Sequence, residues 1–470
     1  MPAVRDSSIT VPASEYYRAH LFWRLFLGNH YRDSWTAPIT VRYFDVKHIK
    51  GGLTPLKLGG GFQTKSLTLM GIDGVEYVMR TVDKDPSKTI DTFFRRTFVK
   101  VIVQDQISAA HPFGFLVVAK LSSTAGIYHS LPEIFYVPDD SALGKYSAIF
   151  KNKLVMLEEY NLTNSSMEPA LRGFNSVIST AEINDFLKSS SDNKVDQRLT
   201  LRSRVFDMLI GDWDRHEDNW RWAQFNLENG QKIFRPIPRD RDQAFFHFDG
   251  LFPAFARLWI PGLRKMQSYK SKPANVKWFN YNARFFDQNY LSELIRNDWR
   301  EITDSLKNEM TDQVIDSALQ VLPDTIYKLT GKELSKTLKG RRDNLSEIAD
   351  KYYRFRAKKV TIQGTNNADY FEVIRSAPNL TEVNVYQING GIKGKRSYHR
   401  LFTKKETKKI LLQGFEGEDV FENSGSAKKK IAIHIVKSKE NIKIINGSKF
   451  NESGKKFKVV EHTKPTSNIK

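Results

Sequence analysis

A short polar loop followed by a strong β-hairpin signal constrains this chain more than any other feature. An apolar helical pattern ends at Gly211, and the polar loop 212–219 leads into a strand-like run at 220–225. Asn229-Gly230 is the dipeptide that most strongly favours a two-residue hairpin turn. The return strand runs through 232–240. The sequence therefore predicts that a helix end, a polar loop and two paired strands meet at one place.

The hairpin register predicts which polar side chains converge. A two-residue turn at 229 and 230 pairs positions whose numbers sum to 459, so Asn219 lies opposite Asp240. Directly paired residues have Cβ atoms about 4.5–5.5 Å apart. Prolines in the return strand can shift the pairing by one residue, and Asp242 is then the next candidate. The preceding loop presents Asp214 beside this point.

These residue types suit a magnesium site used in phosphoryl transfer. An amide oxygen and a carboxylate at one point are hard oxygen ligands of the kind Mg²⁺ prefers. Protein kinases use the same spacing: a catalytic Asp, an Asn five residues on, and a hairpin that leads to a metal-binding Asp. The pattern predicts that Asp214 orients an acceptor hydroxyl and that Asn219 binds Mg²⁺ with Asp240 or Asp242. Each of these residues could instead serve as a helix cap, a turn residue or part of a structural ion-pair network.

The loop also resembles a known family motif. Asp214-Arg215-His216-Glu217-Asp218-Asn219 resembles the Asp-Arg-His loop of atypical kinases, which include phosphoinositide kinases, Golgi casein kinases and spore-coat CotH kinases. The segment 240–245, DRDQAF, is similar to their Asp-Asn-Gly-x-x-Phe or Asp-x-Asp segment but lacks the glycine. More broadly, residues 25–250 resemble a kinase-like region found beside calcineurin-like phosphoesterase domains in envelope proteins of Bacteroidetes-type bacteria. The resemblance implies that Arg215 belongs to the catalytic loop.

The resemblance further implies a smaller lobe that binds ATP. The turn Gly59-Gly60-Gly61 would let backbone N–H groups approach phosphate. Arg80 stands where kinases place a phosphate-binding Lys, with Lys84 as the alternative. Asp105, on a helix expected from Ile90 to Gly126, would supply the acid that pairs with this cation. Glu158 would lie in the segment that joins the lobes and holds adenine.

The expected fold class is α+β, with a bilobal protein-kinase-like domain followed by a small all-β tail. We expect an N-terminal segment and small β-rich lobe over 1–160, a mainly helical large lobe with the hairpin over 161–357, and a basic all-β tail over 358–470. Within the tail, Gly414–Phe421 resembles one degenerate unit of a parallel β-helix repeat, which we interpret as structural.

The composition and charge of the chain limit the metal sites and binding partners that it can have. The chain has 470 residues and a net charge of +20. Because it contains no cysteine, disulfides and thiolate metal sites are excluded. The 115 residues from Arg356 carry 24 Lys and Arg against 11 Asp and Glu, so most of the excess lies in the tail. A basic tail favours an anionic surface, but no motif predicts sequence-specific nucleic-acid binding. We expect no membrane-spanning helix and no signal peptide, although the resemblance suggests a bacterial envelope protein.

Three functions follow from these patterns. The leading one is an ATP- and Mg²⁺-dependent phosphotransferase whose acceptor is a protein Ser or Thr, with lipid as the alternative acceptor. The second is a catalytically inactive pseudokinase or scaffold that binds an anionic surface through its basic tail. The third is a metal-dependent phosphohydrolase that uses Asp212, Asp214, His216, Asp218 and Asp240.

Overall fold

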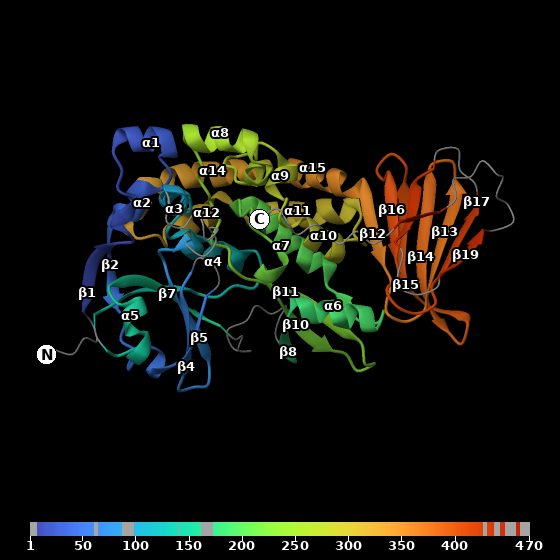
Figure 1. Ribbon diagram of the computed structural model, residues 1–470, viewed down its shortest axis with the longest axis horizontal. Coiled ribbons are helices and arrows are strands. Elements are labelled where there is room, and N and C mark those ends of the chain that lie inside the picture. The colour runs from blue at the N-terminus through green and yellow to red at the C-terminus, as the bar shows by residue number, and fades with distance from the viewer. Residues whose placement is uncertain are drawn as a thin grey trace.

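Figure 1 shows the computed structural model, in which helices and four β-sheets form an α+β fold, as predicted. One sheet lies near the N-terminus, helices and a small sheet occupy the middle, and two further sheets form the C-terminal end. The structure describes residues 7–60, 64–86, 98–139, 141–160, 173–425, 430–436, 442–446 and 457–460.

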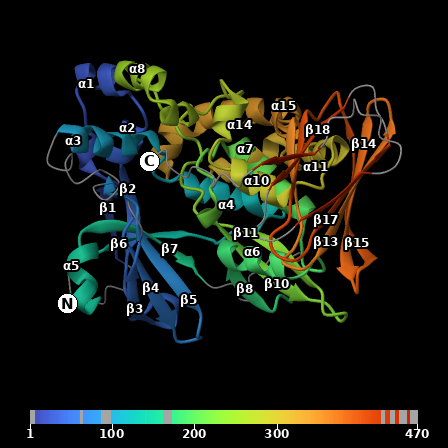
Figure 2. The same cartoon turned by 45° about the vertical axis from the view of Figure 1, so that its right-hand side comes forward.

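The N-terminal sheet contains seven strands. Their order is β1-β2-β6-β7-β5-β4-β3, and Figure 2 shows β3, β4 and β5 at its lower end. Leu67, Leu69 and Met79 face a core between this sheet and its neighbours. The strands are β1 (Ser8–Pro12), β2 (Pro38–Tyr43), β3 (Leu53–Gly59), β4 (Ser66–Gly71), β5 (Glu76–Thr81), β6 (Glu133–Val137) and β7 (Lys153–Glu159).

Many of the helices share one large apolar core. Val117 of α4, Val205 of α7 and Leu306 of α11 all belong to it, so a helix from the N-terminal third packs with helices of the middle region. The predicted domain boundary at residue 160 stays a prediction. The helices are α1 (Leu21–Leu27), α2 (Arg32–Thr36), α3 (Phe98–Asp105), α4 (Gly114–Thr124), α5 (Ser147–Phe150), α6 (Thr180–Ser189), α7 (Gln197–Ile210), α8 (Leu251–Trp259), α9 (Val276–Phe279), α10 (Arg284–Tyr290), α11 (Arg296–Glu309), α12 (Asp312–Leu319), α13 (Asp324–Ile326), α14 (Lys332–Asp343) and α15 (Leu345–Ala357).

The long helix expected from Ile90 to Gly126 is interrupted near Pro112. The structure describes α3 and α4 with an interruption that includes Pro112, while residues 87–97 lie outside the described part. No single helix among the described residues is long and apolar enough to cross a membrane. One pair, 100–109 with 114–124, meets the length and composition test together but is bent by 42°.

The predicted hairpin forms, but its register differs by one residue. β10 (Trp220–Asn226) pairs with β11 (Lys232–Pro238) so that Trp220 lies opposite Pro238, between β8 (Ser176–Ser179) and β9 (Lys194–Val195). The prediction of a two-residue turn is wrong, because Leu227 still pairs with Gln231. The Leu227 N–H donates to the Gln231 carbonyl at 2.8 Å. The loop therefore has three residues and ends at Gly230, whose φ of 79° is left-handed.

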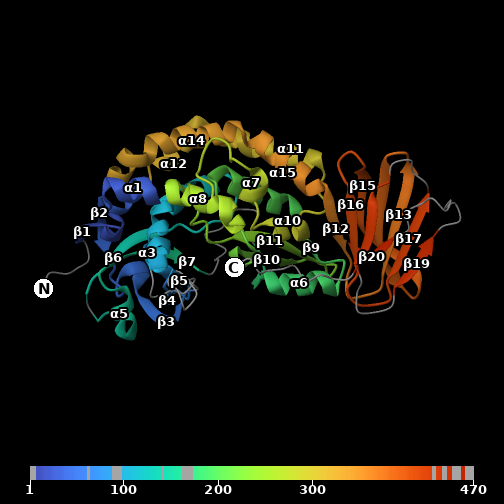
Figure 3. The same ribbon diagram turned by 45° about the horizontal axis from the view of Figure 1, so that its top comes forward.

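After α15 the described elements are strands in two sheets, at the right of Figures 1 and 3. The chain alternates between a parallel sheet, β12-β16-β18-β20, and a mixed sheet, β15-β14-β13-β17-β19, so successive coils stack into a β-solenoid. Its strands are β12 (Lys359–Gln363), β13 (Asp369–Ala377), β14 (Leu380–Asn389), β15 (Ile392–Thr403), β16 (Lys409–Gln413), β17 (Val420–Gly425), β18 (Ala432–Val436), β19 (Lys443–Asn446) and β20 (Lys458–Val460).

The solenoid contains two copies of a corner that runs from a glycine to an aspartate. The sequence predicts only one repeat unit, at Gly414–Phe421, which contains the second copy. The corner Gly364–Asp369 stands directly against Gly414–Asp419, and the Asp369 N–H donates to Asp419 Oδ1 at 3.0 Å. The Phe371 and Phe421 rings stack 4.7 Å apart. A Cβ on Gly414 would lie 1.6 Å from Asp419 Oδ2, so this corner requires glycine. The hairpin β14–β15 separates the copies in sequence.

Candidate active site between the N-terminal sheet and the hairpin

Two left-handed residues frame the site. Gly211 ends α7 as predicted, with φ 77°, and a Cβ there would lie 2.3 Å from the Tyr269 ring. Asp240, directly after β11, has φ 53°, a conformation that non-glycine side chains adopt at a cost. The chain therefore turns sharply before the loop 212–219 and again after the hairpin that follows it. These turns bring α7, the loop and the end of the hairpin to one place.

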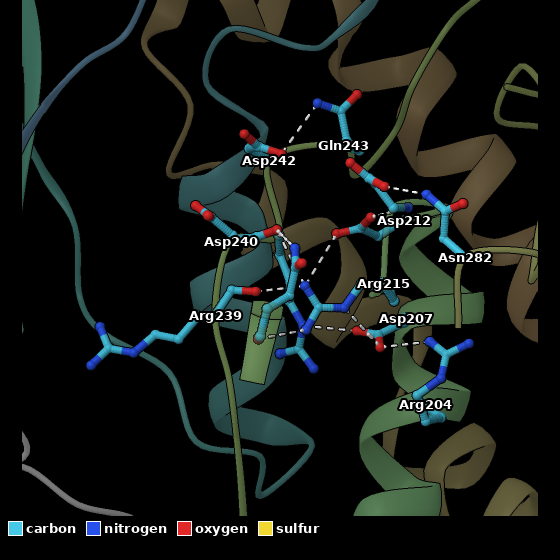
Figure 4. A network of polar contacts seen from close by, with 12 residues as sticks. Arg204, Asp207, Asp212, Arg215, Arg239, Asp240, Asp242, Gln243 and Asn282 are labelled. Atoms are coloured by element: carbon cyan, nitrogen blue, oxygen red, sulfur yellow. Dashed lines mark hydrogen bonds and ion pairs between the residues drawn. The ribbon is translucent and has the colours of Figure 1, made fainter. Parts of the chain in front are cut away.

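A buried aspartate below the loop holds these segments together. Asp207, in the last turn of α7, accepts hydrogen bonds from Arg204 (2.8 Å), Arg241 (2.9 Å) and Arg215 (3.2 Å), as Figure 4 shows in part. Burial opposes ionisation of Asp207, but Arg215, Arg241 and Arg204 outweigh it and hold its pKa below the ordinary value. The carboxylate thus ties a helix, the loop and the segment after the hairpin to one centre. Sequence reasoning missed Asp207; the signal was an aspartate within the apolar run 205–210 that ends α7.

Arg215 is a positioning residue in this geometry. Its side chain is 1% exposed and lies over the Trp220 ring, 4.8 Å from the centroid. Besides Asp207, it donates to the backbone carbonyls of Arg239 at 2.5 Å and Asp240 at 3.2 Å. The predicted catalytic-loop arginine therefore fixes the backbone of the hairpin end.

Asn219 and Asp240 come together in spite of the shifted register. The Arg239 N–H donates to the Asn219 carbonyl at 2.7 Å, and Asn219 Nδ2 donates to the Asp240 carbonyl at 3.5 Å. Asn219 Oδ1 is buried and accepts no hydrogen bond from the described residues. A buried amide oxygen without a partner is free to take a cation or a polar ligand.

The aspartates after β11 face cations of the N-terminal sheet. Asp240 accepts from Arg80 Nη1 at 2.5 Å, and Asp242 accepts from Lys84 Nζ. Partial burial favours the neutral form of Asp240, but Arg80 and then Lys84 outweigh it and hold its pKa below the ordinary value. The two ion pairs join the sheet to the hairpin end. Both predicted cations therefore lie at the site, each with one of the predicted metal-binding aspartates.

Asp214 is held by two neighbours. Its N–H donates to Asp212 Oδ1 at 3.0 Å, and its Oδ1 accepts from the amide of Asn282, in the segment between α9 and α10. Asp212 is buried, and burial raises its pKa to about 8 although Arg215 works in the opposite direction. Asp212 Oδ2 has no hydrogen-bond partner in the described part of the chain. Sequence reasoning used Asp212 only for the phosphohydrolase and missed Asn282.

The expected pairing of Asp105 with Arg80 is wrong. Asp105 accepts two hydrogen bonds from Arg32, at 2.7 and 2.6 Å, and both side chains are buried. Arg80 instead has Glu158 Oε1 at 3.6 Å as its second acid, because β5 and β7 pair side by side. Arg32 lies 73 residues before Asp105, so local spacing gave no sign of this partner.

A pocket lies between the sheet and the hairpin. It has a volume of about 130 Å³. Gly60, with φ 100°, lies near the pocket-lining Thr64: a Cβ on Gly60 would lie 2.1 Å from the Thr64 carbonyl oxygen. Gly59 ends β3, whereas Gly61 lies outside the described residues. The polar and apolar lining includes Arg80, Lys84, Phe115, Ala119, Tyr128, Met156, Glu158, Asp240 and Asp242.

The oxygen ligands present fit one Mg²⁺ better than a two-metal centre. Asn219 Oδ1 has no hydrogen-bond partner among the described residues, and the adjoining residue Asp240 carries a half-exposed carboxylate. Amide and carboxylate oxygens suit Mg²⁺, which keeps waters and substrate oxygens in its remaining positions. Within the described ranges no group of three or more His, Asp or Glu side chains could hold a metal ion. The residues named for a phosphohydrolase therefore do not form such a cluster.

Comparisons with known proteins give weak structural similarities. No family model matches the chain, and no curated protein matches it. It is similar to the Helicobacter pylori proinflammatory kinase CtkA, with TM-score 0.33, 12% identity, and coverage of 64% of this chain and 94% of that one. A Golgi casein kinase matches with TM-score 0.32, 10% identity, and coverage of 74% and 84%. The Rio2 kinase–ADP/Mg²⁺–phosphoaspartate complex of Chaetomium thermophilum matches with TM-score 0.29, 11% identity, and coverage of 63% and 71%.

Proposed function

We propose that the protein is an ATP- and Mg²⁺-dependent phosphotransferase of atypical kinase type. In this proposal the N-terminal sheet and the helical region are the two lobes of a kinase-like domain, and the solenoid is its all-β tail. One observation carries the proposal: Arg80 and Asp240 pair at a pocket between sheet and hairpin, and Asn219 donates to the Asp240 carbonyl beside it. Asn219 Oδ1 has no hydrogen-bond partner among the described residues, and Asp214 belongs to the loop that leads to Asn219.

The residues divide the chemistry between them. Arg80 offers a planar guanidinium that can bind two phosphate oxygens at once. Asp214, fixed by Asn282 and Asp212, orients the acceptor hydroxyl and takes its proton. The hydroxyl oxygen forms a bond to the γ-phosphorus of ATP, the bond from that phosphorus to the β-phosphate oxygen breaks, and ADP leaves. Catalysis then rests on positioning and on charge neutralisation.

Asn219 and Asp240 are the residues that would hold Mg²⁺, with Asp242 beside them. When bound, Mg²⁺ neutralises charge on the transferred phosphate. The ion pairs Arg80–Asp240 and Lys84–Asp242 keep the carboxylates and the phosphate-binding cations within one site. We propose a protein Ser or Thr as the acceptor.

A second candidate is a pseudokinase, which the size of the pocket favours. Its volume of about 130 Å³ is below the roughly 300–1,000 Å³ of ordinary ligand pockets, so a whole nucleotide needs the sheet and hairpin to separate. The helix acid expected for Arg80 is also engaged elsewhere, since Asp105 pairs with Arg32. A pseudokinase would bind nucleotide or a partner without transferring phosphate.

Label transfer tests the proposal. The purified chain is incubated with Mg²⁺, γ-labelled ATP and casein as a general protein acceptor, beside Asp214→Asn and Asp240→Ala. Asp139→Ala is the matched control, because Asp139 is an exposed acid paired with Lys151 away from the site. We expect label with the wild type and the control and at least tenfold less with the two site variants. Nucleotide binding without label on casein or on the chain itself would favour the pseudokinase.

A further inference from the structure

A large cleft separates the parallel sheet of the solenoid from the helical region. Its volume is about 1,270 Å³. One wall is the sheet β12-β16-β18-β20, and the other is formed by α6, α10 and neighbouring loops, which lie beside β12 in Figure 1. The cleft is thus formed by two regions that are distant in sequence.

The sheet wall presents a row of lysines. Lys359 and Lys409 lie directly opposite each other on β12 and β16, and Lys458 stands on β20 in register with His434 of β18. The three lysines form no ion pair with an acidic side chain in the described part of the chain. Partial burial and then Lys409, Lys458 and Lys359 lower the pKa of His434, so this imidazole adds little positive charge to that of the lysines. The wall therefore carries uncompensated positive charge.

The opposite wall is mixed in charge. It contains the cations Lys188 and Arg284 and the amides of Gln288 and Asn289. It also contains two acids, Glu217 and Glu293, the second with Lys194 at 3.8 Å. These acids would repel a uniformly charged polymer such as a nucleic acid. A polypeptide combines acidic side chains with backbone N–H donors and therefore suits both walls.

The cleft reaches the catalytic loop. Glu217, three residues after Asp214, is part of its lining. Tyr281 and Arg284 also line it, and they flank Asn282, whose amide donates to Asp214. A chain bound in the cleft would therefore extend toward the residue that orients the acceptor hydroxyl.

We propose that this cleft binds an extended acidic segment of the polypeptide acceptor. The inference rests on the proposed function for the meaning of the acceptor, but not for the binding itself. Neighbouring strands lie about 4.8 Å apart, and alternate residues of an extended chain lie about 6.6 Å apart. Lys359 and Lys409 on adjacent strands, and Lys458 two strands farther on, can therefore reach carboxylates on one face of such a segment. The basic tail becomes a docking surface for substrate.

Binding is tested without ATP, by fluorescence anisotropy with a fluorescein-labelled peptide of alternating Glu and Ser. Its partner probe has Gln in place of Glu. The cleft variant is Lys359→Glu/Lys409→Glu/Lys458→Glu. The control variant is Lys404→Glu/Lys405→Glu/Lys443→Glu, which changes the net charge equally on residues of the solenoid that do not line the cleft. Thermal unfolding midpoints check that both variants fold.

We expect the wild type and the control variant to bind the Glu peptide, and the cleft variant to bind it about tenfold more weakly, as the sum of three exposed ion pairs. The Gln peptide should bind more weakly than the Glu peptide. Equal loss in both variants, equal binding of the two peptides, or tighter binding of a thymidine oligonucleotide of matched charge would overturn the proposal.

Label transfer to the same peptides separates the two proposals. If the cleft variant loses peptide binding as expected but no chain transfers label, the cleft stands and the phosphotransferase fails. If all chains transfer label equally to the Glu and Gln peptides, the phosphotransferase stands and the acidic docking segment fails.

Discussion

Two groups of charged residues, one around Asp207 and one around Asp240 and Asp242, are built from the same residue types and differ in burial. Below the loop 212–219, the fully buried Asp207 accepts from three guanidinium groups. At the pocket, Asp240 and Asp242 each meet one cation and keep 52% and 39% of their side chains exposed. The first group is buried, whereas the second is partly exposed and can exchange partners. The difference separates residues that hold a site from residues that serve it.

Two buried oxygens beside the loop 212–219 lack hydrogen bonds within the described ranges, although Arg215 Nη1 lies 3.9 Å from one of them, Asp212 Oδ2. Asn219 Oδ1 and Asp212 Oδ2 are buried without hydrogen-bond partners among the described residues. Buried polar atoms normally find partners, so two such atoms beside one loop indicate that the loop is kept for ligands or catalysis at some cost in stability. Variants in the two groups should therefore affect different measurements.

The largest expected effect is on Asp207. Asp207→Ala leaves three buried guanidinium groups without their common acceptor and should lower the free energy of unfolding by about 3–5 kcal/mol. Asp240→Ala breaks an exposed pair and should lower it by less than about 1 kcal/mol. Urea unfolding of both variants measures the contrast. Equal losses of unfolding free energy would show that the difference in burial does not separate the two groups.

A second comparison separates Asp105 from Glu158, the two acids considered for Arg80. Asp105→Asn weakens the buried pair with Arg32 and should cost about 2–3 kcal/mol of stability without changing ADP affinity. Glu158→Gln should leave stability nearly unchanged and alter ADP affinity, because Glu158 neighbours Arg80 at the pocket. Urea unfolding and calorimetric titration of ADP measure the two effects. The reverse pattern would restore Asp105 as the partner of the phosphate-binding cation.

Arg80→Met tests the phosphate-binding cation directly. Losing charge-assisted bonds worth about 1.5–3 kcal/mol should weaken ADP binding roughly tenfold to a hundredfold. Arg42→Met is the control, since Arg42 lies on β2 and pairs with Glu133. Titration calorimetry gives the affinities. Similar affinities for both variants would place the nucleotide elsewhere.

A further effect concerns Asp212 and pH. Its pKa of about 8 is above that of an unfolded aspartate, so the folded state holds a proton that the unfolded state has lost. Its contribution to stability is therefore full at low pH and falls as the pH rises through about 8. Asp212→Asn removes the proton requirement and should flatten the pH dependence of the unfolding free energy between pH 5 and 8 by up to about 1.4 kcal/mol per unit. An unchanged slope would mean that Asp212 is ionised in the fold.

Local signals predicted much of the site. The helix end at Gly211, the hairpin and the position of Arg80 follow from turn chemistry and strand alternation within a few residues. The register was off by one because the loop uses Glu228 as well as the Asn-Gly pair. Asn219 and Asp240 still meet, because the left-handed backbone of Asp240 turns it back toward Asn219.

What the sequence could not predict depends on distant partners or weak patterns. Arg32 captures Asp105 from an element with no local relation to it. The second solenoid corner was hidden because β14 and β15 intervene, and β13 alternates buried with partly exposed residues that do not form an apolar run. Both features depend on contacts between segments that are distant in sequence, and the spacing of residues along the chain does not reveal such contacts.

The most direct test of the account is calorimetric titration of ADP into the chain with and without Mg²⁺, for the wild type, Asp240→Ala and Asp139→Ala. The account predicts Mg²⁺-dependent binding by the wild type and by Asp139→Ala, and its loss in Asp240→Ala with little change in unfolding midpoint. Binding by Asp240→Ala that equals the wild type, or no Mg²⁺ dependence in any chain, would contradict it.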